Sequence, residues 1–157
     1  RLSWHFIGPI QSNKTRAIAE HFDWVHSVDR LKIAERLSAQ RPASLPPLNV
    51  CVQDNVSGET SKSGCAPDET LALCQAIAQL PRLHLRGLMA IPAPLAPGGD
   101  ARAPFRLLRE LWLQLRREGL QVDTLSAGMS DDLEAAIAEG ATLVRIGSAI
   151  FGSRAQR

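Results

Sequence analysis

The sequence lacks several features that would place it in other protein classes. It contains no tyrosine and no run of the ~20 apolar residues that a membrane helix needs, so we expect no membrane partner. Its cysteines are odd in number and show no C-x-x-C spacing, which argues against a disulfide framework and a metal site. We therefore predict a metal-free chain in a reducing, cytoplasmic environment. The cysteines are Cys51, Cys65 and Cys74.

The charge of the chain gives no sign of a nucleic-acid partner. Eighteen basic residues against 16 acidic ones leave a net charge of +2, and the arginines are scattered along the sequence. The 157 residues, of which 45% are hydrophobic and 22% charged, suit one globular domain that spans residues 1–157. Disordered, coiled-coil and collagen-like chains are excluded by the same figures.

Short apolar segments alternate with segments of helical spacing along the whole chain. The clearest helix places Leu108, Leu111, Trp112 and Leu115 on one face and stops at Gly119. Strict alternation of strands and helices forces parallel pairing through right-handed crossovers, which predicts an α/β fold. The six expected strands are 4–8, 24–28, 49–53, 85–91, 124–126 and 143–146.

Two α/β architectures compete for this pattern, a doubly wound sheet and a (β/α)8 barrel of the TIM type. The first strand leads into Gly8-Pro9-Ile10, which lacks the G-x-G-x-x-G fingerprint of the doubly wound dinucleotide folds. A complete barrel needs ~250 residues, so about six βα units correspond to a barrel in which two strands are missing. We expect these to be the first two strands.

The last two expected strands end in residues suited to binding phosphate. Residues 126–132 form a Ser/Gly turn before a helix, and residues 147–152 follow the final strand. Small residues let backbone N–H groups approach an anion, hydroxyls add donors, and a helix N-terminus favours negative charge. The alternative is that Ser130 only caps a helix and Gly147 only makes a turn.

Arg145 lies between two apolar residues of the last strand and must find an acceptor or a carboxylate. A structural salt bridge with Asp123 or Glu134 is one solution, and a ligand is the other. Lys62 lies in a polar loop that follows a strand and should face the same end of the sheet. The four histidines show no ligand spacing and are expected to be core or surface residues.

Five segments together resemble one protein family, in order and over essentially the whole chain. This family comprises the pyridoxal phosphate homeostasis proteins (YggS/PROSC type), which are related to the N-terminal barrel of alanine racemase. The segments are WHFIGPIQSNK (4–14), SKSG (61–64), GLMAIP (87–92), GMSDDLE (128–134) and VRIGSAIFG (144–152).

The resemblance implies a pyridoxal 5'-phosphate (PLP) protein on a (β/α)8 barrel. It places the phosphate at Ser130, Gly147 and Ser148 and sets Arg145 against the pyridine nitrogen, which an arginine keeps unprotonated. The remaining cofactor-binding residues are expected to be Gly128, Met129, Met89, Asn13 and Lys62. In the family the Schiff-base lysine precedes the WHFIG segment, so we expect it upstream of residue 1.

The resemblance leaves three functions open. The first is a PLP carrier for intracellular PLP homeostasis that turns over no dedicated substrate, is monomeric when complete and passes PLP to apo-enzymes. The second is a PLP-dependent racemase of the alanine racemase class, which the absence of tyrosine disfavours because that mechanism uses a tyrosine base. The third is a barrel that binds another phosphorylated ligand.

Overall fold

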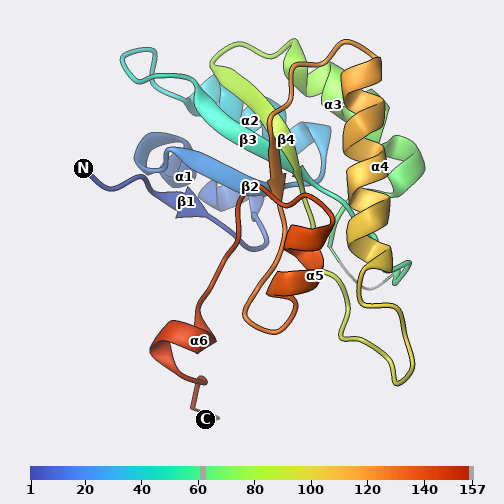
Figure 1. Ribbon diagram of the computed structural model, residues 1–157. Coiled ribbons are helices and arrows are strands. Elements are labelled where there is room, and N and C mark those ends of the chain that lie inside the picture. Colours follow the sequence, from blue (N-terminus) through green and yellow to red (C-terminus); the bar gives the residue numbers. More distant parts are fainter. Residues whose placement is uncertain (61–62, 156–157) are drawn as a thin grey trace.

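A five-stranded parallel sheet forms the centre of the computed structural model, which describes residues 1–60 and 63–155 (Figure 1). The strands lie side by side in chain order, β1-β2-β3-β4-β5. Doubly wound sheets reverse their strand order, whereas barrels keep it, so this order confirms the barrel type of α/β fold. The strands are β1 (His5–Phe6), β2 (Trp24–Val28), β3 (Leu48–Gln53), β4 (Leu83–Met89) and β5 (Thr124–Ser126).

Helices connect successive strands and pack against one another in the same sequence, α1 on α2, α2 on α3 and α3 on α4. Two short 3₁₀ turns, Ser12–Lys14 and Pro67–Glu69, lead into α1 and α3. The last helix, α6, lies apart from the sheet near the C-terminus (Figure 1). The helices are α1 (Thr15–His21), α2 (Leu31–Gln40), α3 (Thr70–Ala78), α4 (Ala103–Arg117), α5 (Leu133–Ala138) and α6 (Ser148–Phe151).

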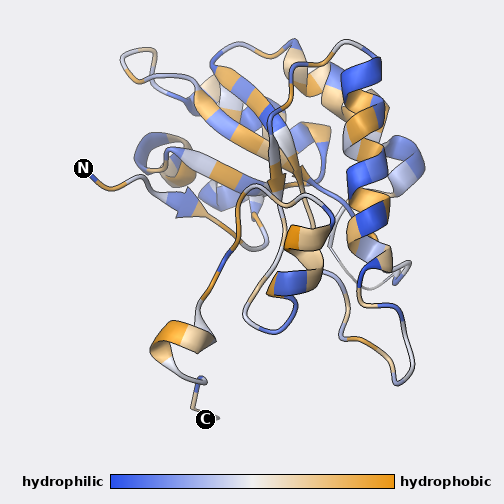
Figure 2. Cartoon of the chain, viewed as in Figure 1, coloured by the Kyte–Doolittle hydropathy of each residue, from blue (hydrophilic) through white to orange (hydrophobic). Residues whose placement is uncertain are grey.

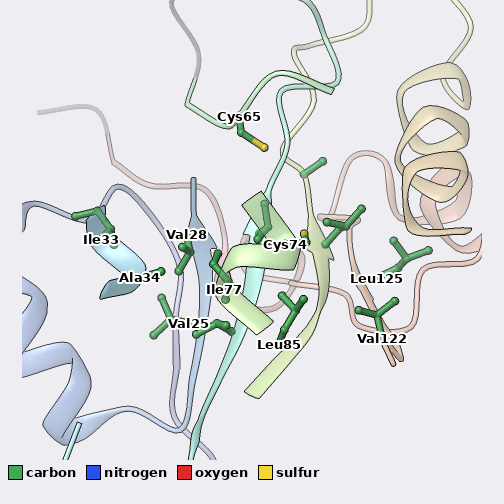
Figure 3. Close-up of a cluster of buried hydrophobic side chains, with 14 of the residues drawn as sticks. Val25, Val28, Ile33, Ala34, Cys65, Cys74, Ile77, Leu85, Val122 and Leu125 are labelled. Atoms are coloured by element: carbon green, nitrogen blue, oxygen red, sulfur yellow. The ribbon is translucent and has the colours of Figure 1, made fainter. Parts of the chain in front are cut away.

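The hydrophobic core lies between the sheet and these helices (Figure 3). Val25 of β2 and Leu85 of β4 belong to one cluster with Ile33 of α2 and Ile77 of α3. Successive residues of a strand point to opposite faces, so the residues between these core positions face the inside of the half-barrel. Cys51 and Met89 are fully buried there but lie outside the core cluster.

The expected amphipathic helix is α4, and its pattern is confirmed. Leu108, Leu111 and Leu115 are buried, while polar residues cover the outer side of the helix (Figure 2). Gly119 follows with φ of 87°, a conformation that favours glycine at the end of a helix. Among the described residues, no helix has the length and apolar character to cross a membrane.

One glycine is required by the close approach of two strands. Gly87 of β4 pairs with Thr124 of β5, and a Cβ atom at Gly87 would lie 1.7 Å from the Thr124 carbonyl oxygen. Any side chain at this position would push the two strands apart. Gly87 therefore allows β5 to join the sheet.

The expected sixth strand, 143–146, is wrong as a regular strand. Leu143 makes a single parallel bridge with Ser126, and the Ala127 N–H donates to the Leu143 carbonyl oxygen (3.1 Å). A regular ladder would next join Arg145 to Ala127, but the Arg145 N–H donates to the Gly128 carbonyl oxygen instead (2.8 Å). This one-residue shift ends the ladder after one bridge.

Candidate functional site

The two segments expected to bind phosphate meet beyond the end of β5. The Ser130 hydroxyl accepts a hydrogen bond from the Ala149 N–H in α6, at 3.1 Å. Helix α5 has no side-chain cap, and its N-cap residue is Asp132. The alternative that Ser130 caps this helix is therefore wrong, because its hydroxyl joins the loop after β5 to the start of α6.

Gly128 and Met129 shape this loop. Gly128 has φ of 103°, and a Cβ atom there would lie 2.9 Å from the Ala136 Cβ, so only glycine lets α5 pack this closely. The Met129 N–H donates to the Asp132 carboxylate at 2.7 Å. That amide is therefore already occupied, while the Met129 side chain remains exposed.

Arg145 has two hydrogen-bond donors without a partner. Its Nη2 donates to the Ala90 carbonyl oxygen at 2.9 Å, whereas Nε and Nη1 are buried with no acceptor among the described residues. Burial lowers the pKa of this guanidinium, and Asp132 acts in the opposite direction, but an arginine stays charged in proteins. Buried donors of this kind call for an acceptor.

The expected salt bridge of Arg145 with Asp123 or Glu134 is wrong. Asp123 is bound by Arg86 at 2.8 Å, and in the part of the chain that the structure describes Arg145 makes no ion pair. Asp123 directly precedes β5, whereas Arg145 follows the carboxyl end of that strand and donates to the Ala90 carbonyl oxygen just beyond β4. Arg145 and Asp123 therefore lie at opposite ends of β5.

A pocket of about 490 Å³ opens beside Arg145. It brings together Met129, Arg145 and Gly147, which the sequence singled out, with His5 and Ile7 from the region of β1. A second cavity of about 850 Å³ borders the same loop and includes Met129 and Ser130. Met129 thus lies between the two cavities.

Other expected site residues lie elsewhere. Met89 is fully buried at the end of β4 and lines neither cavity, and Asn13 is exposed in the first 3₁₀ turn. Ser148 is the exposed first residue of α6. Lys62 lies outside the described residues. The structure therefore groups Gly128, Met129, Ser130, Arg145, Gly147 and Ser148. Met89 directly precedes Ala90, whose carbonyl oxygen accepts from Arg145, whereas Asn13 lines neither cavity.

The sequence did not reveal a chain of polar side chains inside the sheet. The imidazoles of His5 and His26 are joined by a hydrogen bond of 2.8 Å, and His26 is joined to the Ser126 hydroxyl by one of 2.7 Å. His26 lies two residues after Trp24, on a strand whose register with β1 the sequence leaves undetermined. No cluster of three potential metal ligands occurs among the described residues.

Comparison with known proteins identifies the family. The family model for the alanine racemase N-terminal domain matches residues 2–155. A pyridoxal phosphate homeostasis protein of Pseudomonas aeruginosa is 71% identical over 98% of this chain, which spans 65% of that relative's length. The structure of PipY from Synechococcus elongatus with PLP bound is 37% identical, with a TM-score of 0.84 over 96% of this chain and 71% of PipY.

An alanine racemase of Clostridium difficile shares the fold at 13% identity, with a TM-score of 0.78 over 99% of this chain and 41% of the racemase. The fold likeness and the match to the family model agree with the strand order of the sheet. The chain belongs to the family of alanine racemase N-terminal domains.

Proposed function

We propose that this chain is part of a PLP-binding protein that acts in intracellular PLP homeostasis, as a carrier or reservoir without a dedicated substrate. The proposal is supported by the name of the 71% identical relative and by the PLP in the structure of PipY. It applies to a whole protein of which this chain represents about two thirds of the relative's length. PLP-dependent apo-enzymes are the proposed recipients of the cofactor.

The observation that carries the proposal is the pair of unpartnered donors on Arg145. PLP supplies an aldehyde that condenses with amines and a pyridine ring that withdraws electrons. A pyridine nitrogen with a free lone pair is an acceptor, and Arg145 offers donors only. Nε and Nη1 of Arg145 fit this group because no described residue accepts from them.

The phosphate would be held by Ser130 and by the segment around Gly147 and Ser148. Ser130 already bonds to the Ala149 N–H, so its hydroxyl proton is free to donate to an anion. Ser148 adds an exposed hydroxyl at the first position of α6. The phosphate-binding groups therefore lie on the two segments that also border the Arg145 pocket.

Pyridoxamine 5'-phosphate is a suitable probe, because it has the ring and phosphate of PLP but needs no bond to a lysine. Calorimetric titration should show binding to this chain, and Arg145→Gln should weaken it at least tenfold, since a charged donor pair is lost. Arg117→Gln, at an exposed arginine at the end of α4, is the matched control and should leave affinity unchanged.

Equal affinity of the Arg145→Gln variant and the parent chain would contradict the ring-nitrogen contact. The carrier role has its own test, the incubation of the PLP-loaded full-length protein with L-alanine. Production of D-alanine would favour the racemase in place of the carrier.

A further inference from the structure

A groove opens between the loop that follows β4 and the start of α5. It is the cavity of about 850 Å³ that includes Met129 and Ser130, and residues 91–95 form one wall while residues 129–135 form the other. The loop of the first wall extends away from the sheet near α5 (Figure 1). Ser130 of the second wall also belongs to the proposed phosphate site. The groove therefore begins beside that site.

Hydrogen bonds join several other neighbouring segments at this end of the sheet. They run from the Ser27 hydroxyl to the Gly8 carbonyl oxygen (2.6 Å), from the Gly64 N–H to the Asp29 carboxylate (3.1 Å) and from the Ala93 N–H to the Ser57 hydroxyl (2.7 Å). Within the part of the chain that the structure describes, no hydrogen bond joins residues 91–101 to residues 127–135. A further segment can therefore lie between the two walls without breaking such a bond.

Apolar side chains cover the inside of this groove. Phe105, from the first turn of α4, is buried and lines it together with Ile91. Leu95 on one wall is 59% exposed, and Met129 on the opposite wall is 45% exposed. Exposed apolar side chains that gather around a hollow typically mark a surface that another molecule covers.

The charged residues that line the groove are all acidic, namely Asp131, Asp132 and Glu134. Asp131 and Glu134 are exposed and take part in no ion pair among the described residues. Arg102, which directly precedes α4, is bound to Glu139 instead. The groove is therefore negative although the whole chain has a net charge of +2, and it attracts cations and repels anions.

These features fit the recipient of the cofactor in the proposed function. PLP-dependent enzymes hold PLP through a lysine, so an enzyme without its cofactor presents a free cationic amine. A protein segment with a lysine next to an apolar side chain would bury the apolar group against Leu95 and Met129 and set the amine near Glu134. A second phosphorylated molecule does not fit, because the acidic residues repel it.

We propose that the groove docks a segment of a PLP-free enzyme in which a lysine lies next to an apolar side chain. This inference rests on the proposed function and specifies where the recipient binds. Docking in the groove places the recipient beside Ser130, which belongs to the loop that would hold the phosphate. The recipient therefore lies next to the cofactor that it receives.

The binding of two PLP-free enzymes from the same organism, an aminotransferase and a decarboxylase, to the full-length protein tests this surface. Surface plasmon resonance should show that Glu134→Lys weakens binding at least tenfold, because it repels the cationic segment. Leu95→Ser should weaken it about fivefold through the loss of apolar contact. Glu110→Lys and Leu113→Ser, at exposed positions of α4 outside the groove, are the matched controls and should change affinity less than twofold.

A second measurement separates docking from folding and from cofactor binding. The affinity for pyridoxamine 5'-phosphate should stay within twofold in all four variants, because none of the replaced residues is part of the proposed cofactor site. Saturation of the two enzymes with PLP occupies their lysines and should weaken docking at least fivefold. Equal losses of docking in the control variants, or no binding of either PLP-free enzyme, would overturn the inference. A dimer of the full-length protein that Leu95→Ser dissociates would assign the groove to a second copy and would also overturn it.

The two proposals fail in different ways. If the parent chain does not bind pyridoxamine 5'-phosphate, the proposed function fails, whatever the two enzymes do. If pyridoxamine 5'-phosphate binds and neither PLP-free enzyme does, the docking surface fails and the proposed cofactor site stands.

Discussion

At the scale of the residue, the carboxyl group of Asp54 is unusual in its burial. Asp54 follows β3 and is 2% exposed, and its Oδ1 accepts from Thr70 and from the Cys65 thiol. Burial raises its pKa to about 7, although these two hydrogen bonds act in the opposite direction. One carboxylate oxygen, Oδ2, has no partner among the described residues. The ionised form is therefore disfavoured in the folded chain.

This raised pKa predicts a specific pH dependence of stability. The carboxyl group has a pKa of ~3.9 in the unfolded chain. The contribution of the protonated Asp54 to the free energy of unfolding is therefore complete below that pH and is lost as the pH rises through about 7. The free energy of unfolding of Asp54→Asn minus that of the parent should be about 3 kcal/mol larger at pH 8 than at pH 5, because about two pH units separate pH 5 from the pKa of the folded chain.

Urea unfolding at pH 5, 6, 7 and 8 measures both values. Asp68→Asn, at an exposed aspartate of the second 3₁₀ turn, is the matched control and should show no difference that grows with pH. If the free energy of unfolding changed with pH in the same way for Asp54→Asn and the parent, Asp54 would ionise normally.

At the scale of the element, a buried carboxylate joins α4 to the end of α5. Glu139, with a side chain 2% exposed, lies 2.8 Å from Nε of Arg102, 3.8 Å from Nε of Arg106 and 3.1 Å from Nη1 of Arg109. Arg102 is the N-cap residue of α4, and Arg106 and Arg109 follow at spacings of four and three residues, so the three side chains lie on one side of the helix. One side chain thus holds two helices together.

Replacement of this carboxylate should loosen the contact between the helices. Glu139→Gln keeps the shape but directs amide protons at the arginines, and we expect a loss of about 2 kcal/mol in the free energy of unfolding, less than for a fully buried pair because the arginines reach solvent. Glu110→Gln, at an exposed residue of α4, should change stability by less than about 0.5 kcal/mol. Equal effects of the two substitutions in denaturant unfolding would contradict the role of Glu139 in holding α4 and α5 together.

The elements themselves could largely be predicted, for a physical reason. Leu108, Leu111 and Leu115 repeat at the helical period, and this pattern is local. The absence of a regular strand at residues 143–146 could not be predicted. The pairing with β5 ends after the bridge between Leu143 and Ser126, where the register shifts by one residue at Gly128. Register depends on contacts between strands, which a periodicity does not contain.

At the scale of the whole molecule, the order of the strands determines which side chains meet. The positions of Ser130 and Gly147 after the last two expected strands predicted that they lie together, because parallel strands bring their carboxyl ends to one edge. The hydrogen bonds that join His5, His26 and Ser126 were not predicted, since His26 and Ser126 meet across the inside of the sheet and carry no motif. The expected salt bridge of Arg145 with Asp123 or Glu134 could also be ruled out only from the structure.

The arrangement of α6 leads to a prediction about the whole chain. This helix has no buried residue, and Ile150 and Phe151 are 67% and 86% exposed. The Ala149 N–H of this helix donates to the Ser130 hydroxyl in the loop after β5. Helix α6 therefore contributes little to folding, although the proposed phosphate site includes its first residues.

Removal of residues 147–157 should separate stability from binding. We expect the free energy of unfolding to change by less than about 1 kcal/mol, because little apolar area is uncovered. The affinity for pyridoxamine 5'-phosphate should fall more than tenfold, since Gly147 and Ser148 are lost. Removal of residues 153–157 alone is the control and should affect neither. Undiminished binding without α6 would place the phosphate elsewhere, whereas a large loss of stability would mean that α6 packs against the barrel.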